Sequence, residues 1–244
     1  MKKILSVTLA ISIFTLFTSC SKDATVQADA SQSGVGGSMA RFAVVGDYLY
    51  TVNSSDLEII DIKNPASPNY VSTKSVGFGI ETIFPYNNHL FIGAQTGMYI
   101  YDISSPANPN KLSQYEHIYS CDPVVVQDDY AYVTLHSENS WCGRFTDELH
   151  IIDISNLNSP QLLTTYTMGN PLGLGVDGNN LFVCDEGLKV YDITNKQSIE
   201  LKQHFKITAY DVIPYTNLLI VIGDNGLYQY DYSGADLTLL STIN

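Results

Sequence analysis

Short apolar runs alternate with polar turns along most of this chain, and five of the runs end in nearly the same way. The similar runs cover residues 57–62, 98–103, 149–154, 188–193 and 227–232, and each carries an aspartate as its fifth residue. These aspartates, at positions 61, 102, 153, 192 and 231, are spaced by 41, 51, 39 and 39 residues. Self-similarity at a period of about 40 residues indicates a repeat architecture.

Each repeat divides into four runs of strand length. In the first repeat they cover residues 41–45, 48–52, 57–62 and 70–76, with turn residues between them. Many runs are apolar on both sides of the pleat, a pattern typical of sheets that are covered on both faces. We therefore predict an all-β fold over residues 39–244, a single five-bladed β-propeller of four-stranded antiparallel blades. Ring closure is expected to rely on packing between the first and last blades.

The repeat carries a family resemblance. Strands of the type Leu-x-Ile-Ile-Asp-Ile or Leu-x-Val-Tyr-Asp-Ile lead into turns of the type Ser/Asn-x-Pro, as at residues 102–106, and this pattern resembles the LVIVD repeat family. The resemblance weakens in the last repeat, where Asp231-Tyr232-Ser233-Gly234 replaces the proline turn. It implies a propeller and a bacterial cell-surface or secreted setting, mostly without an assigned activity. It supplies no catalytic residue.

The N-terminal segment looks like an export signal. A basic start precedes an apolar run at residues 4–17, which is short for a membrane span and typical of a signal peptide. Small residues before Cys20 resemble a bacterial lipobox, although Phe17 departs from it; an ordinary signal peptide with an incidental cysteine is the alternative. We predict a signal peptide at 1–19, lipidation of Cys20 and a flexible tether at 20–38. Ser21 favours an outer-membrane lipoprotein, facing the periplasm or exposed at the surface.

Charge excludes one class of partner. The chain has 12 basic and 25 acidic side chains, a net charge of −13, and loses two lysines with residues 1–19, which leaves −15. Phosphate backbones would repel such a chain, so we expect no nucleic-acid partner. The 45% of hydrophobic residues supports a substantial core and argues against disorder.

The five repeat aspartates are the most conspicuous acidic residues. An aspartate at the end of a strand can accept hydrogen bonds from backbone N–H groups of the turn that follows. We therefore predict that they are structural.

The 51-residue spacing marks an insert at residues 135–148, which contains the only tryptophan. We expect the insert on the face where one blade connects to the next. A loop bearing aromatic and arginine side chains suits recognition, although these side chains could merely pack the loop onto the third blade. The candidate ligand-binding residues are His136, Trp141, Arg144 and Phe145.

Cysteine positions suggest one disulfide. Cys121 begins the third blade and Cys142 lies in its insert, so both fall on the same face of one blade. Because an exported protein meets an oxidising compartment, we predict a Cys121–Cys142 disulfide. Cys184, inside an apolar run, is predicted to be a buried free thiol.

Three carboxylates open innermost strands near the predicted channel mouth: Glu81, Asp122 and Asp211. Together they could hold Ca²⁺ or another hard cation, or they could cap strands or pair with Arg41. His117 and His136 could approach the same face. No metalloprotease, nucleophile-elbow or phosphate-loop motif occurs, so no residue is predicted to be catalytic.

Two functions therefore stand. The first is a lipid-anchored propeller without catalysis or cofactor, which binds an envelope protein or polysaccharide through the insert face. The second is a hydrolase or lyase with a cation at the channel mouth. Propellers host both kinds of function, so the fold does not choose between them.

Overall fold

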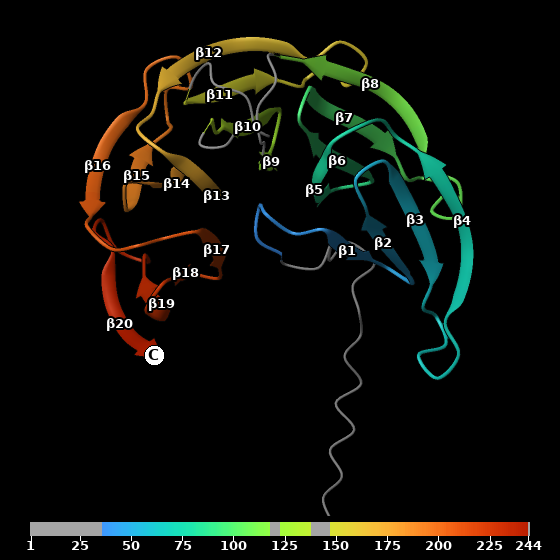
Figure 1. Ribbon diagram of the computed structural model, residues 1–244. Coiled ribbons are helices and arrows are strands. Elements are labelled where there is room, and N and C mark those ends of the chain that lie inside the picture. Colours follow the sequence, from blue (N-terminus) through green and yellow to red (C-terminus); the bar gives the residue numbers. More distant parts are fainter. Residues whose placement is uncertain (1–35, 118–122, 138–146, 244) are drawn as a thin grey trace, which may run out of the picture.

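The protein is a five-bladed β-propeller. The computed structural model describes residues 36–117, 123–137 and 147–243, where the regular structure consists of twenty strands in five antiparallel sheets of four. Figure 1 shows the sheets arranged as blades around a centre, with the first strand of each blade innermost and the fourth at the rim. The fold class predicted from the repeat is confirmed. None of the described residues forms a helix that could span a bilayer.

The strand bounds follow the sequence repeat. The first blade contains β1 (Phe42–Val45), β2 (Tyr48–Val52), β3 (Asp56–Asp61) and β4 (Asn69–Ser75). The second contains β5 (Ile80–Tyr86), β6 (His89–Ala94), β7 (Gly97–Asp102) and β8 (Asn110–Glu116). The third contains β9 (Val124–Gln127), β10 (Tyr130–Leu135), β11 (Glu148–Asp153) and β12 (Gln161–Thr167). The fourth contains β13 (Pro171–Asp177), β14 (Asn180–Asp185), β15 (Leu188–Asp192) and β16 (Glu200–Phe205). The fifth contains β17 (Asp211–Tyr215), β18 (Leu218–Gly223), β19 (Gly226–Asp231) and β20 (Thr238–Ile243).

The first turn of every blade uses the same backbone conformation. A two-residue turn joins the first and second strands, and its first residue has a positive φ in all five repeats: Gly46 (56°), Asn87 (51°), Asp128 (55°), Gly178 (56°) and Thr216 (46°). A left-handed residue at this position gives a turn whose twist matches that of the flanking strands. Four of the five positions carry Gly, Asn or Asp, the residue types that tolerate this conformation best.

The five repeat aspartates are structural, as predicted. Each accepts a hydrogen bond at Oδ1 from the backbone N–H two residues later, and the five donors are Lys63 (2.9 Å), Ser104 (2.8 Å), Ser155 (2.9 Å), Thr194 (2.8 Å) and Ser233 (2.8 Å). This bond forms the turn between the third and fourth strands. It explains why the aspartate ends the strand in every repeat.

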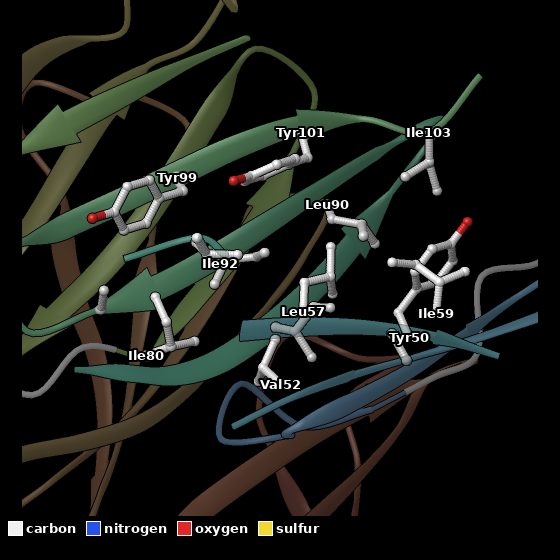
Figure 2. Packing of buried hydrophobic residues seen from close by; sticks show 14 residues of the cluster. Tyr50, Val52, Leu57, Ile59, Ile80, Leu90, Ile92, Tyr99, Tyr101 and Ile103 are labelled. Atoms are coloured by element: carbon white, nitrogen blue, oxygen red, sulfur yellow. The ribbon is translucent and has the colours of Figure 1, made fainter. Parts of the chain in front are cut away.

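Consecutive blades are joined by apolar packing. Figure 2 shows the first of these interfaces, where Tyr50, Leu57 and Ile59 of the first blade face Leu90 and Ile92 of the second. Three similar clusters join the second blade to the third, the third to the fourth and the fourth to the fifth. Each interior blade therefore buries both faces, which accounts for strands that are apolar on both sides.

The expectation that the first and last blades pack directly on each other is wrong for the described residues. None of the four apolar clusters contains residues of both blades. In Figure 1 the arc of blades is open between β1–β4 and β17–β20. The two blades are linked instead through the segment before β1, because Ser38 donates a hydrogen bond to Asp211 of β17 (2.9 Å).

At the opening, the facing sides of the first and last blades carry apolar residues like those of the other blade interfaces, but these residues are less buried. The second strand of each blade has one position whose side chain faces the preceding blade. In the last four blades the residue at this position is fully buried: Leu90, Ala131, Leu181 and Leu219. The next position faces the following blade and is equally buried in the first four: Tyr50, Phe91, Tyr132 and Phe182. At the opening these two positions are Leu49 and Ile220, and both are only partly buried.

Candidate functional site at the channel mouth

The centre of the propeller contains two cavities, one towards each end of the inner strands. The larger, of about 310 Å³, lies at the end where β5 begins, which we call the upper mouth. Its lining comprises Met39, Arg41, Glu81, Thr82, Pro123, His136, Pro171 and Leu172. The smaller, of about 210 Å³, lies towards the lower mouth, where the inner strands end. The upper cavity contains three of the chemically versatile residues considered from the sequence, namely Arg41, Glu81 and His136.

A β-bulge brings Glu81 to the upper cavity. The pairing of β5 with β6 shifts register between Ile80 and Thr82, so Glu81 is the extra residue on its strand. Bulges commonly redirect a side chain at the rim of a sheet. The Glu81 carboxylate accepts a hydrogen bond from Nε2 of Gln95, in the turn that follows β6 (3.1 Å). The sequence analysis did not identify Gln95. Its position in a predicted turn was the only sequence feature that could have suggested a role at the site.

Arg41 contributes a cation beside this carboxylate-bearing strand. It directly precedes β1, and its Nη2 donates a hydrogen bond to the backbone carbonyl of Ile80 (3.3 Å). The guanidinium group is thereby held across the boundary between the first and second blades. Since Arg41 and Glu81 line one cavity, the upper mouth offers both fixed donors and carboxylate acceptors.

His136 is the third polar residue of the cavity, and it lies where the insert begins. It is 8% exposed, and its Nδ1 lies 3.7 Å from Oδ1 of Asp147, at the other end of the insert. The same Asp147 oxygen accepts hydrogen bonds from the backbone N–H (3.0 Å) and hydroxyl (2.9 Å) of Ser137. Asp147 thus ties the two ends of the insert together beside the cavity, a role that the sequence did not reveal.

Several predicted residues lie outside the described part of the chain. They are Cys20, Cys121, Asp122, Trp141, Cys142, Arg144 and Phe145. The lipidation of Cys20, the Cys121–Cys142 disulfide and the contribution of the insert's aromatic side chains therefore stay predictions. Cys184 is described and is a buried free thiol, as expected; burial raises its pKa.

The carboxylates predicted to bind a cation do not all face the cavity. Asp211 is absent from its lining and instead accepts hydrogen bonds from the Ser38 hydroxyl (2.9 Å), Val212 N–H (2.9 Å) and Met39 N–H (3.4 Å). Burial, the largest effect, raises the pKa of Asp211, against the opposing influence of these bonds. Within residues 36–117, 123–137 and 147–243, no three His, Cys, Asp or Glu side chains group as metal ligands. The predicted cation site at Glu81, Asp122 and Asp211 stays a prediction, because Asp122 lies outside the described residues.

The histidines are arranged differently from our expectation. His117, which we expected near the channel-mouth face with His136, packs against His150 with ring centroids 6.3 Å apart. His150 Nε2 lies 2.8 Å from Glu148 Oε2, and its Nδ1 lies 3.2 Å from the Tyr115 hydroxyl. Burial, the largest effect, lowers the pKa of His150, and Glu148 acts in the opposite direction. This cluster joins the second and third blades, and we assign it a structural role.

The chemistry of the upper cavity suits binding of an amphipathic ligand. Polar groups of both signs lie beside apolar surface from Met39, Pro171 and Leu172. Its volume is at the lower end of the range for small-molecule sites. Such a site can hold a sugar unit or a short peptide segment, because both present apolar surface together with hydrogen-bonding groups.

Comparison with known proteins identifies the repeat. A family model described as LVIVD repeat matches residues 36–74, 83–117, 120–168 and 169–206, which include four of the five blades. The resemblance read from the sequence is confirmed, and the fifth blade, where that resemblance weakens, lies outside the match. No curated protein shows significant sequence similarity to the chain.

Three solved structures of similar fold are each longer than this chain. A protein from Lactobacillus plantarum matches with a TM-score of 0.65 and 15% identity over 80% of this chain and 67% of its own. The periplasmic gluconolactonase PpgL of Pseudomonas aeruginosa matches with a TM-score of 0.60 and 13% identity over 82% of this chain and 67% of its own. BamB from Moraxella catarrhalis matches with a TM-score of 0.60 and 11% identity over 78% and 56% respectively. At these identities the similarity concerns the fold alone.

Proposed function

This chain belongs to the LVIVD repeat family, and we propose that it is a lipid-anchored binding module of the bacterial cell envelope. In this proposal the upper cavity takes up part of an envelope protein or polysaccharide, and no bond of the ligand is broken. The observation that carries the proposal is the cavity of about 310 Å³ lined by Arg41, Glu81 and His136.

The polar side chains of the cavity are positioned by neighbours, which favours recognition. Arg41 is held by the Ile80 carbonyl, Glu81 by Gln95, and His136 lies close to Asp147. Hydrogen-bonding groups that are fixed before the ligand arrives lose little conformational freedom on binding. An acidic protein that presents Arg41 at such a mouth would favour ligands that combine acceptors for Arg41 with hydroxyl or N–H donors for Glu81.

The second candidate is a hydrolase or lyase that uses a cation at the same mouth. The observation that favours it is the presence of the Glu81 carboxylate in the cavity, and one structure of similar fold is named a gluconolactonase. That neighbour shares 13% identity with this chain, so its activity is a reason to test lactone hydrolysis and nothing more. Turnover of a bound ligand, dependent on a divalent cation and on Glu81, would support this candidate over the first.

Envelope attachment can be tested separately from ligand binding. The motivation is the apolar run at 4–17 followed by small residues and Cys20. Replacing Cys20 with alanine should move the protein from the membrane fraction to the soluble exported fraction. A variant that stays in the membrane after carbonate extraction would contradict lipidation of Cys20.

Ligand binding is best tested with the soluble Cys20→Ala chain on an array of bacterial surface polysaccharides and peptidoglycan fragments. For any glycan that is bound, Arg41→Ala and Glu81→Gln should each weaken the affinity by about tenfold or more, as expected for a fixed polar contact in a pocket. Isothermal titration calorimetry measures the change.

The matched control is Lys63→Ala, which also removes one cation but from an exposed turn of the first blade. This variant should bind as the unmodified chain does. Equal losses in Arg41→Ala and Lys63→Ala would show that net charge, and not the cavity, governs binding. Unchanged affinity in both cavity variants would exclude the upper mouth as the glycan site.

A further inference from the structure

The lower cavity differs in chemistry from the upper one. It lies among the inner strands β5, β9, β13 and β17, at the centre of the arc in Figure 1. None of the described residues that line it carries a charged side chain, and its walls include Phe84, Pro85, Tyr86, Val125, Val176 and Pro214. Its volume of about 210 Å³ is below the usual range for drug-sized ligands. The lower cavity therefore suits one apolar group of about the size of a side chain.

A smaller cavity, which we call the side cavity, adjoins the lower cavity at Tyr86. It has a volume of about 150 Å³ and lies between the second and third blades. Tyr86 lines both cavities. The polar residues of the side cavity are Asn87, His89, Asp128, Asp129 and Ser155. A ligand can thus place an apolar group in the lower cavity and a polar group in the side cavity at the same time.

Side chains at this junction are held across blade boundaries. The Tyr86 hydroxyl accepts a hydrogen bond from Asp128 N–H (2.8 Å), which joins the second blade to the third. The Gln127 amide, in the lining of the lower cavity, donates to the Gly178 carbonyl and accepts from Gly178 N–H, both at 2.8 Å. Because these bonds order Tyr86 and Gln127 in advance, little conformational freedom is lost when a ligand binds.

The carboxylates of the side cavity are accessible to a cation. Asp128 and Asp129 are both exposed, and within the described part of the chain neither forms an ion pair. Burial, the largest effect, lowers the pKa of His89, and Asp102 acts in the opposite direction. His89 is therefore neutral near pH 7 and does not repel a cation in this cavity.

The lower side of the propeller as a whole is acidic. The turns after the first and third strands meet there in every blade, as shown by the hydrogen bond from Ile154 N–H to the Asp129 carbonyl (2.8 Å). These turns and the strand ends beside them contain Asp47, Asp61, Asp102, Asp128, Asp129, Asp153, Asp177, Asp192, Asp231 and Asp236. The basic residues of the same turns are Lys63 and Lys196. A field of this sign attracts cationic ligands.

The pair Asp128-Asp129 distinguishes the third blade from the others. The corresponding turns are Gly46-Asp47, Asn87-Asn88, Gly178-Asn179 and Thr216-Asn217. All five turns begin with a residue of positive φ. The turn geometry therefore does not require two adjacent acids.

We propose that the lower cavity and the side cavity together form a second binding site, which takes a short peptide segment in which an apolar side chain adjoins a lysine or arginine. The apolar side chain fills the lower cavity beside Phe84 and Val176, and the cation pairs with Asp128 and Asp129. A peptide presents these two groups on neighbouring side chains, which matches two cavities joined at one residue. The site is separate from the upper cavity and does not rest on the function proposed for it.

Methyl NMR spectroscopy of the soluble Cys20→Ala chain tests the location of this site. The probes are acetyl-Phe-Lys-amide and acetyl-Phe-Glu-amide. The lysine peptide should shift the methyl signals of Val125 and Val176, whereas those of Leu172 in the upper cavity should stay in place. The glutamate peptide should bind more weakly, because the carboxylates repel it. Shifts confined to Leu172, no shifts at millimolar peptide, or equal binding of the two peptides would each overturn the proposal.

Variants of the turn test the charge contacts. The double change Asp128→Asn and Asp129→Asn gives the third blade the Asn-Asn turn of the second, so the fold should be retained. Its affinity for the lysine peptide should fall by about fivefold or more, as expected for the loss of two partly exposed ion pairs.

The matched control compares single changes. Asp47 has the position of Asp129 in the turn of the first blade, on the same acidic side but outside both cavities. Asp129→Asn should therefore weaken binding of the lysine peptide more than Asp47→Asn does. Equal losses would mean that the general field, and not the side cavity, attracts the peptide, and would overturn the site.

A small amine distinguishes a peptide ligand from a free metabolite-sized one. The probe is 2-phenylethylamine, which carries a ring and a cation but no peptide backbone. It should bind more weakly than acetyl-Phe-Lys-amide. Tighter binding of the amine, lost in the double aspartate variant, would overturn the assignment of a peptide to this site.

Discussion

Ser38 Oγ lies 2.9 Å from Oδ1 of Asp211, and this hydrogen bond joins residues 173 positions apart. It connects the segment that leads into the first blade with the innermost strand of the last. Because no apolar cluster of the described residues spans these two blades, the polar contact takes the place that packing holds at the other four interfaces.

Removing the Ser38 hydroxyl should destabilise the propeller. In Ser38→Ala, the N–H of Leu174 and the Asp211 carboxylate both lose a partner in a buried setting, which costs about 1–3 kcal/mol. The free energy of unfolding from urea denaturation measures the loss. Ser104→Ala is the matched control, since its hydroxyl also bonds an aspartate, Asp102, but at an exposed turn. The two variants should differ clearly, and equal losses would contradict the buried role of Ser38.

Two aspartates should affect the pH dependence of stability in opposite directions. The folded-state pKa of Asp211 is raised by burial, so its stabilising contribution is present at low pH and lost as pH rises through that pKa. The stability of the unmodified chain relative to Asp211→Asn should therefore fall as pH rises from about 4 towards neutrality.

For Asp102 the sign is reversed. Hydrogen bonds from the Ser104 side chain and backbone lower its pKa, so its contribution is present above the ordinary aspartate pKa and lost as pH falls. The unmodified chain should lose stability relative to Asp102→Asn below about pH 4. Denaturant titrations of both variants across pH 3–7 give the two slopes. If the stability difference changed with pH in the same direction for both variants, the opposite pKa shifts of Asp211 and Asp102 would be contradicted.

Adjacent residues of β18 should differ in their cost of truncation. Leu219 faces the fourth blade and is fully buried, whereas Ile220 faces the opening and is only partly buried. Leu219→Ala should cost about 2–5 kcal/mol through lost burial and the cavity left behind, and Ile220→Ala distinctly less. Thermal and urea unfolding compare them. Similar losses would mean that the Ile220 face is covered in solution.

The Cys121–Cys142 disulfide can be tested on exported protein. If formed, it closes a loop of about twenty residues, for which the chain-entropy estimate is roughly 3 kcal/mol. Cys142→Ser should make residues 136–148 a preferred site of proteolysis while the rest of the propeller stays folded. Mass spectrometry of the non-reduced protein detects the bond directly. Two free thiols in exported material would remove the premise.

The local sequence determined the blades because their signals are short-range. Three signals define each repeat: a turn with a left-handed first residue, an aspartate that bonds the N–H two residues later, and an apolar run of strand length. All three act within about six residues, so each repeat could be interpreted by itself. The bulge that carries Glu81 and the hydrogen bond from Gln95 were not readable, since both depend on how two strands pair.

Relations between blades were decided by the tertiary structure. Nothing in the repeat distinguishes Leu49 and Ile220 from their buried counterparts; only the arrangement of the blades leaves these two partly uncovered. Asp211 looked like a channel-mouth ligand because its strand begins there, yet it bonds Ser38 from the far end of the chain. The sequence by itself determined the repeat unit, because its interactions are local. Only the folded chain decided the channel and its mouth, because those depend on how strands pair and on which blades come together.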